Sequence, residues 1–197
     1  MQSHSNRVRI IGGVWRSRQI AVLQQEGLRP SSDRVRETLF NWLGQDLSGL
    51  KVLDVFAGSG ALGFESASRG ANQIVLIEKD KRTFKQLQAQ YQQLISSPIT
   101  GHLEIIEGDG LAYMRQLDKD SYHLVLLDPP FSQPEVLKAA VIEAGRICDD
   151  RFGGGIYIES SITQELSELE KLLVGWTCVR QMQTAQTRAA LFRRTSG

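Results

Sequence analysis

Cysteine and long apolar runs are scarce in this sequence. Its 197 residues contain only two cysteines, Cys148 and Cys178, without the C-x-x-C spacing or nearby histidine pair of a zinc site. We therefore expect neither a disulfide scaffold nor a bound metal, and we expect the protein to occupy a reducing compartment. No apolar run exceeds strand length, and the polar N-terminus lacks the apolar core of a signal peptide. We expect a cytoplasmic protein, neither secreted nor membrane-spanning.

The overall composition is that of a globular protein. Hydrophobic residues make up 41% of the chain, aromatic residues 7% and charged residues 23%. A chain of this length can bury about 70% of the surface that its unfolded form exposes, so it can build a core without disulfides. The expectation is a compact monomer.

Lysine is absent from the first 36 residues, where positive charge comes from arginine alone. Seven arginines stand there against Glu26 and Asp33, giving +5; residues 180–197 carry +4, and the remainder carries −8. A basic arm on an acidic body is typical of a protein with a polyanionic partner, although a solvated arm serving only solubility explains the charge as well. Because arginine binds phosphate as a planar fork and stacks on bases, the composition favours nucleic acid.

From residue 51 onward, short apolar runs alternate with helical periods, which predicts a parallel α/β sheet. We expect five such strands, at 51–56, 73–78, 102–106, 123–127 and 156–160. Runs at 177–182 and 189–194 are too close for a crossover helix and should form an antiparallel hairpin that completes seven strands. Helices are expected at 61–69, after Asp80, at 134–144 and at 163–173. A β-hairpin at 7–23 and a short helix capped by Ser32 or Asp33 precede the sheet.

A glycine loop follows the first expected strand. Gly58, Gly60 and Gly63 fit G-x-G-x-x-G between a strand and a helix, and Glu78 ends the next strand, where a carboxylate can accept both ribose hydroxyls of an adenosine cofactor. NAD and S-adenosylmethionine both fit this much. Asp54 distinguishes them, because an anion there opposes a pyrophosphate but suits a cationic amino group and a sulfonium. The loop therefore favours S-adenosylmethionine. Asp109 follows the third strand as either an acceptor for the adenine amine or a helix cap.

Asp128-Pro129-Pro130-Phe131 ends the fourth strand, at the sheet edge where open α/β folds bind ligands. The two prolines stiffen the segment and leave carbonyl oxygens pointing outward. If Asp128 and the Pro129 carbonyl each accept one N–H of an exocyclic amine, its lone pair can be aimed at a methyl donor, and Phe131 can stack on the base. A proline-stiffened turn with a capping Asp is the structural alternative.

These motifs resemble the class I S-adenosylmethionine-dependent methyltransferases. The leader R-I-I-G-G-x-W-R-S-R (9–18), followed by L-R-P-S-S-D-R-V-R-E-T-L-F-N-W-L (28–43), resembles the RsmD family of bacterial 16S rRNA guanine-N2 methyltransferases over nearly the whole chain. The resemblance implies a Rossmann-like fold and N2 methylation of the guanine at position 966 of 16S rRNA, within the assembled 30S subunit. It implies cofactor contacts from Asp54, Phe56, Gly58, Gly60, Glu78, Asp109 and Gly110, and an amine-orienting role for Asp128, Pro129, Pro130 and Phe131.

The arginine-rich leader is the expected RNA surface, an N-terminal hairpin arm over residues 1–30 ahead of a methyltransferase domain over 31–197. The residues expected to contact RNA are Arg7, Arg9, Trp15, Arg16, Arg18, Arg34 and Arg36. For Trp15, anchoring the hairpin to the domain is equally open, and Arg34 and Arg36 are open to a role at the cofactor carboxylate. The target base should be looped or flipped out, because a base inside a duplex cannot reach the pocket.

Three other functions share parts of this pattern. A DNA adenine or protein glutamine methyltransferase would share the core, although the chain has no room for a large target-recognition domain. An NAD oxidoreductase would share the glycine loop but not explain Asp54 or the D-P-P-F segment. A non-catalytic RNA-binding protein would use the arginines but not Asp128.

Overall fold

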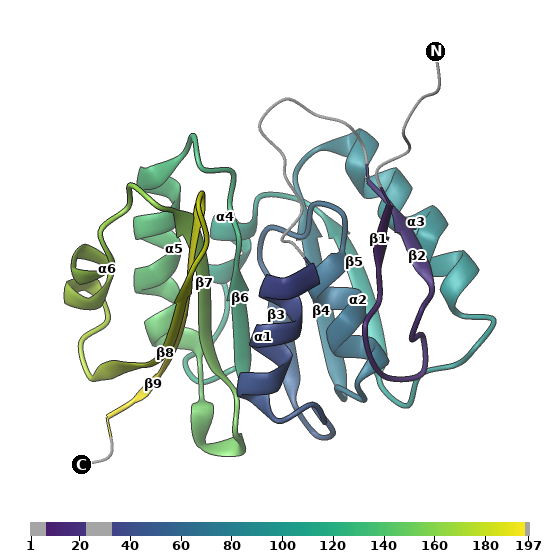
Figure 1. The fold of residues 1–197 in the computed structure, drawn as a ribbon, viewed down its shortest axis with the longest axis horizontal. Helices are drawn as coiled ribbons and strands as arrows, with labels where there is room; N and C mark the ends of the chain where they lie inside the picture. The colour runs from purple at the N-terminus through teal and green to yellow at the C-terminus, as the bar shows by residue number, and fades with distance from the viewer. Residues whose placement is uncertain (1–6, 23–32, 196–197) are drawn as a thin grey trace.

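A seven-stranded sheet organises the computed structural model, which describes residues 7–22 and 33–195 (Figure 1). The strand order is β5-β4-β3-β6-β7-β9-β8. Strands β3, β4, β5, β6 and β7 are parallel, whereas β9 pairs antiparallel with both β7 and β8, so β9 alone runs against the others. The strands span Lys51–Asp54 (β3), Gln73–Glu78 (β4), His102–Glu107 (β5), Leu124–Leu127 (β6), Gly155–Ser161 (β7), Trp176–Gln183 (β8) and Thr187–Arg194 (β9). The predicted mostly parallel α/β sheet with a C-terminal antiparallel hairpin is confirmed.

Helices cover both faces of the sheet because the central strands are apolar on both sides. β6 is buried at all four of its residues, as a strand packed on two faces must be. One core cluster joins the sheet to α1, α2 and α3, and the other joins it to α4, α5 and α6. The helices span Asp33–Leu43 (α1), Ala61–Ser68 (α2), Lys81–Leu94 (α3), Gly110–Met114 (α4), Pro134–Ile147 (α5) and Leu166–Leu172 (α6), with a 3-10 turn at Asp150–Phe152 (η1).

The expected N-terminal hairpin is present and lies along α3 (Figure 1). Strands β1 (Arg7–Arg9) and β2 (Gln19–Ala21) pair antiparallel, and their connection packs on α2. Ile10, Trp15 and Ile20 belong to the same core cluster as α1, α2 and α3. The hairpin is thus built into the core of the sheet domain along its apolar side. The domain boundary expected at residue 30, the Ser32 cap and Arg29 lie outside the described residues.

Several local predictions hold and a few boundaries differ. Asp80 caps α3 by accepting hydrogen bonds from the backbone N–H groups of Arg82 and Thr83, as expected. The strand at 73–78 has the predicted bounds, whereas β3 ends at Asp54 because the chain turns there into the glycine loop. The last helix begins at Leu166, three residues later than predicted. α4 was foreseen only through the alternative that Asp109 caps a helix, and η1 was not predicted, because five and three residues hold too little periodicity to identify a helix.

The chain runs outward from β3 through β4 to β5 and then crosses back to β6 on the other side of β3, so the strand order reverses direction at β3. Open α/β folds bind ligands at such a point, outside the carboxyl ends of the strands. Asp54, Glu78, Asp109 and Asp128 all lie at or just beyond these ends. Within the described ranges, no helix is long and apolar enough to cross a bilayer, and no three metal-ligating side chains gather.

Candidate active site

The glycine loop turns back on β3 through Asp54. The Asp54 side chain is buried, and its Oδ2 accepts a hydrogen bond from the Gly63 N–H at 3.0 Å. Gly60 begins α2 in the left-handed region, at φ 80°, and a Cβ there would come within 2.5 Å of the Phe64 ring. Asp54 and Gly60 therefore shape the glycine loop, and neither of them lines the cavity described below.

The Asp54 carboxyl makes stability depend on pH. Burial, partly offset by the Gly63 hydrogen bond, raises the pKa of Asp54 from 3.8 to about 7. Between these values the unfolded chain binds fewer protons than the folded one, so the free energy of unfolding falls as pH rises from about 4 to 7. We expect Asp54→Asn, which keeps an oxygen for the Gly63 N–H, to flatten this slope. Denaturant titrations of both proteins at pH 5 and pH 8 test this, and equal pH dependence would contradict it.

Glu78 links the ends of β3 and β4. Its Oε2 accepts a hydrogen bond from the Gly58 N–H at 2.8 Å, and its Oε1 accepts one from the Asp80 N–H at 2.7 Å. Burial raises the pKa of this carboxyl, against the lowering effect of those two backbone hydrogen bonds. Glu78 therefore holds the tip of the glycine loop while presenting a partly buried carboxylate to the cavity.

Asp109 occupies the N-cap position of α4, as one of its two alternatives predicted. Its Oδ1 accepts a hydrogen bond from the Ala112 N–H at 3.0 Å, and Lys79 Nζ lies 2.9 Å from its Oδ2. The Ala112 hydrogen bond, followed by that from Lys79, lowers the pKa of Asp109. Gly110 follows where a Cβ would lie 2.2 Å from the Val55 carbonyl oxygen, so only glycine lets α4 approach β3 this closely. Lys79 was not identified from the sequence, although its position next to Glu78 was a signal.

A cavity of about 400 Å³ opens at the carboxyl edge between these elements. Its volume falls in the range of small-molecule sites. Five of the seven predicted cofactor residues line it, together with Asp128 and Pro130: they are Phe56, Gly58, Glu78, Asp109 and Gly110. The structure therefore brings these predicted residues together around one cavity.

The D-P-P-F segment separates this cavity from a second one of about 260 Å³. Asp128 lines the first cavity, Pro129 and Phe131 line the second, and Pro130 and Gln133 line both. Pro129 is buried, whereas the Phe131 side chain is 42% exposed. The stiff segment thus forms a wall shared by two neighbouring cavities. This arrangement suits transfer of a group from a molecule in one cavity to a molecule in the other.

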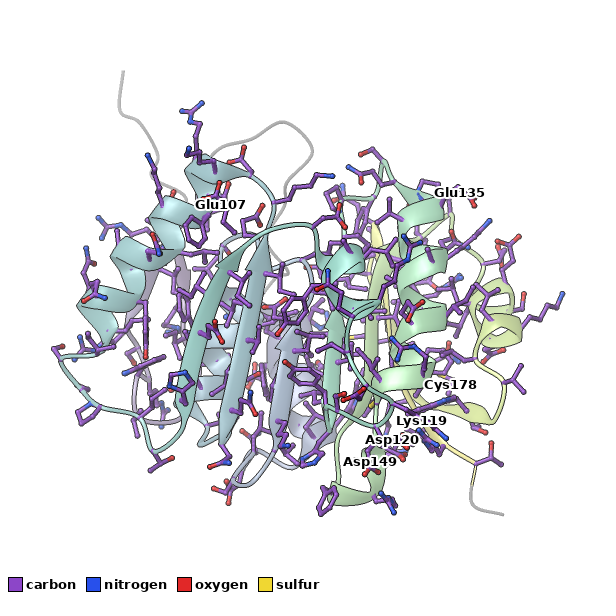
Figure 2. The ribbon with its side chains drawn as sticks, turned by 180° about the vertical axis from the view of Figure 1, so that it is seen from behind. Glu107, Lys119, Asp120, Glu135, Asp149 and Cys178 are labelled. Carbon is purple, nitrogen blue, oxygen red and sulfur yellow. The ribbon has the colours of Figure 1, made fainter. Side chains whose placement is uncertain are left out.

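Figure 2 shows the two edges of the sheet from behind. Glu107, at the end of β5, and Glu135, in the first turn of α5, lie at the edge that carries the cavities. Asp120 and Asp149 lie at the opposite edge, where they pair with Arg194 and Arg151. That acidic group therefore serves the fold and not the candidate site.

Two of the residues expected to contact RNA are buried, and for them the expectation is corrected. Trp15 is fully buried, packs edge-on against Phe64 and Tyr91, and donates from Nε1 to the Ser97 carbonyl at 2.7 Å. Of its two alternatives, the structure supports the anchor. Arg36 is also fully buried, so it reaches neither RNA nor a cofactor carboxylate.

Arg36 instead joins a buried ionic cluster. It donates to the Arg9 carbonyl at 2.8 Å and pairs with Asp33 at 2.6 Å. Its Nη1 lies 3.7 Å from Oε2 of Glu65, which also pairs with Arg69 at 2.8 Å. Glu65 was not identified from the sequence; its i,i+4 spacing to Arg69 was visible, but its contact with the leader was not.

The remaining leader arginines stay at the surface. Arg7, Arg9, Arg16 and Arg34 are exposed, and Arg9 and Arg16 line one small cavity. Arg18 is half-buried and donates to Ser96 Oγ at 3.2 Å and Ser97 Oγ at 2.7 Å, which fixes it to the chain after α3. The exposed arginines therefore form the part of the leader that a polyanion can reach.

Known proteins are similar to this chain in sequence and in fold. The family model described as "Conserved hypothetical protein 95" matches residues 8–193. The chain is 37% identical to ribosomal RNA small subunit methyltransferase D of Haemophilus influenzae over 90% of this chain and 89% of that protein, and 35% identical to its Escherichia coli namesake over 98% and 92%. A solved Escherichia coli structure described as a candidate methyltransferase, yhhF, superposes with a TM-score of 0.79 at 30% identity, covering 96% of this chain and 98% of that one.

Proposed function

Since the chain belongs to the RsmD family of ribosomal RNA small subunit methyltransferases, we propose that it uses S-adenosylmethionine to methylate the exocyclic N2 amine of a guanine in 16S rRNA. The observation that carries this proposal is the Asp128-Pro129-Pro130 wall between two cavities. One cavity has the lining that an adenosine cofactor needs, and the other adjoins an exposed aromatic ring.

The first cavity fits S-adenosylmethionine by the chemistry of its lining. Glu78 offers a carboxylate for ribose hydroxyls, and Asp109 offers one for the adenine amine. Gly110 lines this cavity without a side chain of its own, beside Val55. The cofactor, when bound, supplies a methyl group made electrophilic by its positively charged sulfur.

The chain's own residues then act on the amine. The nitrogen lone pair of a guanine N2 amine is delocalised into the ring and must be localised before it can attack. Asp128 and the Pro129 carbonyl each accept one N–H, which turns the lone pair toward the first cavity. Asp128 takes the proton as positive charge develops on nitrogen, because a carboxylate can accept a proton from a nitrogen that is becoming cationic but not from the neutral amine. Phe131 stacks on the base and keeps it in place.

The exposed leader arginines are proposed to bind phosphates around the target base. Each arginine that neutralises a phosphate contributes roughly 0.7 to the slope of log K against log salt for a single strand. We expect Arg9→Ala with Arg16→Ala to weaken binding to small subunits and lower this slope by about 1.4, with cofactor affinity unchanged. Arg151→Ala, a change at the opposite edge, is the matched control. An unchanged slope in the double variant would remove these residues from the RNA surface.

Tritiated methyl transfer tests the proposed function directly. Small ribosomal subunits from cells lacking this gene are incubated with the enzyme and labelled S-adenosylmethionine, and the RNA is digested to nucleosides. Label in N2-methylguanosine, from subunits but not from free 16S rRNA, is the expected result. Label in N6-methyladenosine, or transfer to DNA or protein instead, would keep the enzyme class and overturn the proposed base and substrate.

A further inference from the structure

A buried acid, Glu159, lines the second cavity opposite the D-P-P-F wall. It lies near the carboxyl end of β7 and is 3% exposed. Pro129 and Phe131 also line this cavity, so one open cavity joins the proposed amine-orienting segment to a carboxylate. A cofactor in the first cavity does not need this acid, because Glu159 lies outside that cavity's lining.

The register of the sheet places Glu159 beside Asp128. β6 and β7 are parallel, with Leu127 paired to Ile158. Asp128 and Glu159 are the residues that follow this pair. Adjacent strands lie about 4.8 Å apart. This register brings the two acids to neighbouring positions at the sheet edge, where Asp128 lines the first cavity and Glu159 the second.

Tyr157 orients the Glu159 carboxylate. The Tyr157 hydroxyl donates to Glu159 Oε2 at 3.0 Å within the core. Burial, with the nearby charges of Glu159 and Asp128, raises the pKa of Tyr157 well above its usual value, which keeps the phenol protonated and able to donate. The hydrogen bond from the tyrosine thus holds one oxygen of the Glu159 carboxylate and fixes the orientation of the carboxylate.

We infer that Glu159 recognises guanine by accepting a hydrogen bond from its N1–H while Asp128 and Pro129 hold the neighbouring N2 amine. This inference rests on the proposed function and adds the residue that selects the base. Guanine presents two adjacent donors, N1–H and N2–H, on its Watson–Crick edge, and two adjacent carboxylates match them. Adenine presents an unprotonated N1, whose lone pair would face the Glu159 carboxylate.

A base with the amine but without the N1 proton tests this recognition. 2-Aminopurine keeps the 2-amino group of guanine, and its N1 is an acceptor. Small subunits are reconstituted with 16S rRNA in which ligation places guanine or 2-aminopurine at the position that the wild-type enzyme methylates. We expect the wild-type enzyme to prefer guanine by about 100-fold in kcat/KM, because a buried charged acceptor would meet an unpaired lone pair.

The variant Glu159→Gln replaces the carboxylate by an amide that can also donate to an unprotonated N1. We expect transfer to guanine to fall by about 10- to 100-fold and the preference over 2-aminopurine to fall at least tenfold. Equal loss on both bases, or no loss on either, would overturn the inference. Glu104→Gln, the same change at an exposed position of β5, is the matched control.

Two further measurements separate recognition from folding and from the proposed function. Cofactor affinity by calorimetry should be unchanged in Glu159→Gln. If that variant does not fold, Tyr157→Phe keeps the acid but removes its orienting donor, and should lower kcat/KM for guanine about 3- to 10-fold with cofactor affinity intact; unchanged kcat/KM would overturn the inference. Failure of the wild-type enzyme to methylate any guanine would instead reject the proposed function itself.

Discussion

Asp128→Ala is expected to lower kcat for methyl transfer to small subunits about 1000-fold. By the proposed mechanism, the variant loses the acceptor that orients the amine and the group that takes its proton, and general acid–base groups contribute 10²- to 10⁴-fold. Asp128 lines the first cavity, but the carboxylates proposed to hold the ribose and the adenine of the cofactor belong to Glu78 and Asp109. Cofactor affinity should therefore stay within about threefold. Single-turnover transfer and calorimetry measure the two quantities separately.

Asp128→Asn divides that loss into its two parts. An amide oxygen can still accept an N–H and orient the amine, but it cannot take a full proton. An intermediate loss, about 10- to 100-fold, is expected. Asp118→Ala, at an exposed position in the connection between α4 and β6, is the matched control and should retain full activity. If Asp128→Ala kept more than a tenth of the wild-type rate, the D-P-P-F segment would be a structural turn and not the amine-orienting element.

The sequence was informative where neighbours along the chain decide the structure. In Gln73–Glu78, apolar and polar residues do not alternate as in a half-exposed strand, so the segment is predicted as a buried strand. The structure confirms this prediction. Asp80 precedes an amphipathic run and caps it. The order of strands and helices then brings Glu78, Asp109 and Asp128 to one edge, so the cavity that they line follows from local patterns and a general topological rule.

The sequence was uninformative where distant residues decide burial. Arginine side chains are almost never fully buried unless paired, so Arg36 was expected at the surface. Its partners include Glu65, 29 positions away, and the Arg9 carbonyl, 27 positions away, and no local pattern announces them. Glu159 was overlooked for the same reason, since its significance depends on β7 lying beside β6. Membership in a methyltransferase family also removes the NAD oxidoreductase and the non-catalytic RNA-binding protein as alternatives.

Glu65→Ala is expected to destabilise the fold by about 3 to 5 kcal/mol, because Glu65 is the acid that joins the leader to the sheet domain. Its fully buried carboxylate accepts hydrogen bonds from the Ile11 N–H and the Gly12 N–H, each at 2.7 Å, and from Arg69 Nε at 2.9 Å. The variant would leave two guanidinium groups buried without this carboxylate. For a chain of this size the loss corresponds to a fall in Tm of roughly 10 °C.

Calorimetric melting of matched variants separates two contributions of Glu65 to stability: its charge, and its hydrogen bonds to the leader backbone. Glu37→Ala, an exposed change on α1, should alter stability by no more than about 0.5 kcal/mol. In the described part of the chain, Arg36 Nε and Nη1 have no hydrogen-bond partner, so this arginine depends on the nearby carboxylates for its charge. Adding Arg36→Met to Glu65→Ala removes that buried charge and should restore part of the loss, because a buried ion pair can be replaced by apolar residues at little cost. The remaining loss measures the anchoring of Ile11 and Gly12 together with the broken pair between Arg69 and Glu65. Strict additivity of the two changes would show instead that Arg36 and Glu65 contribute independently.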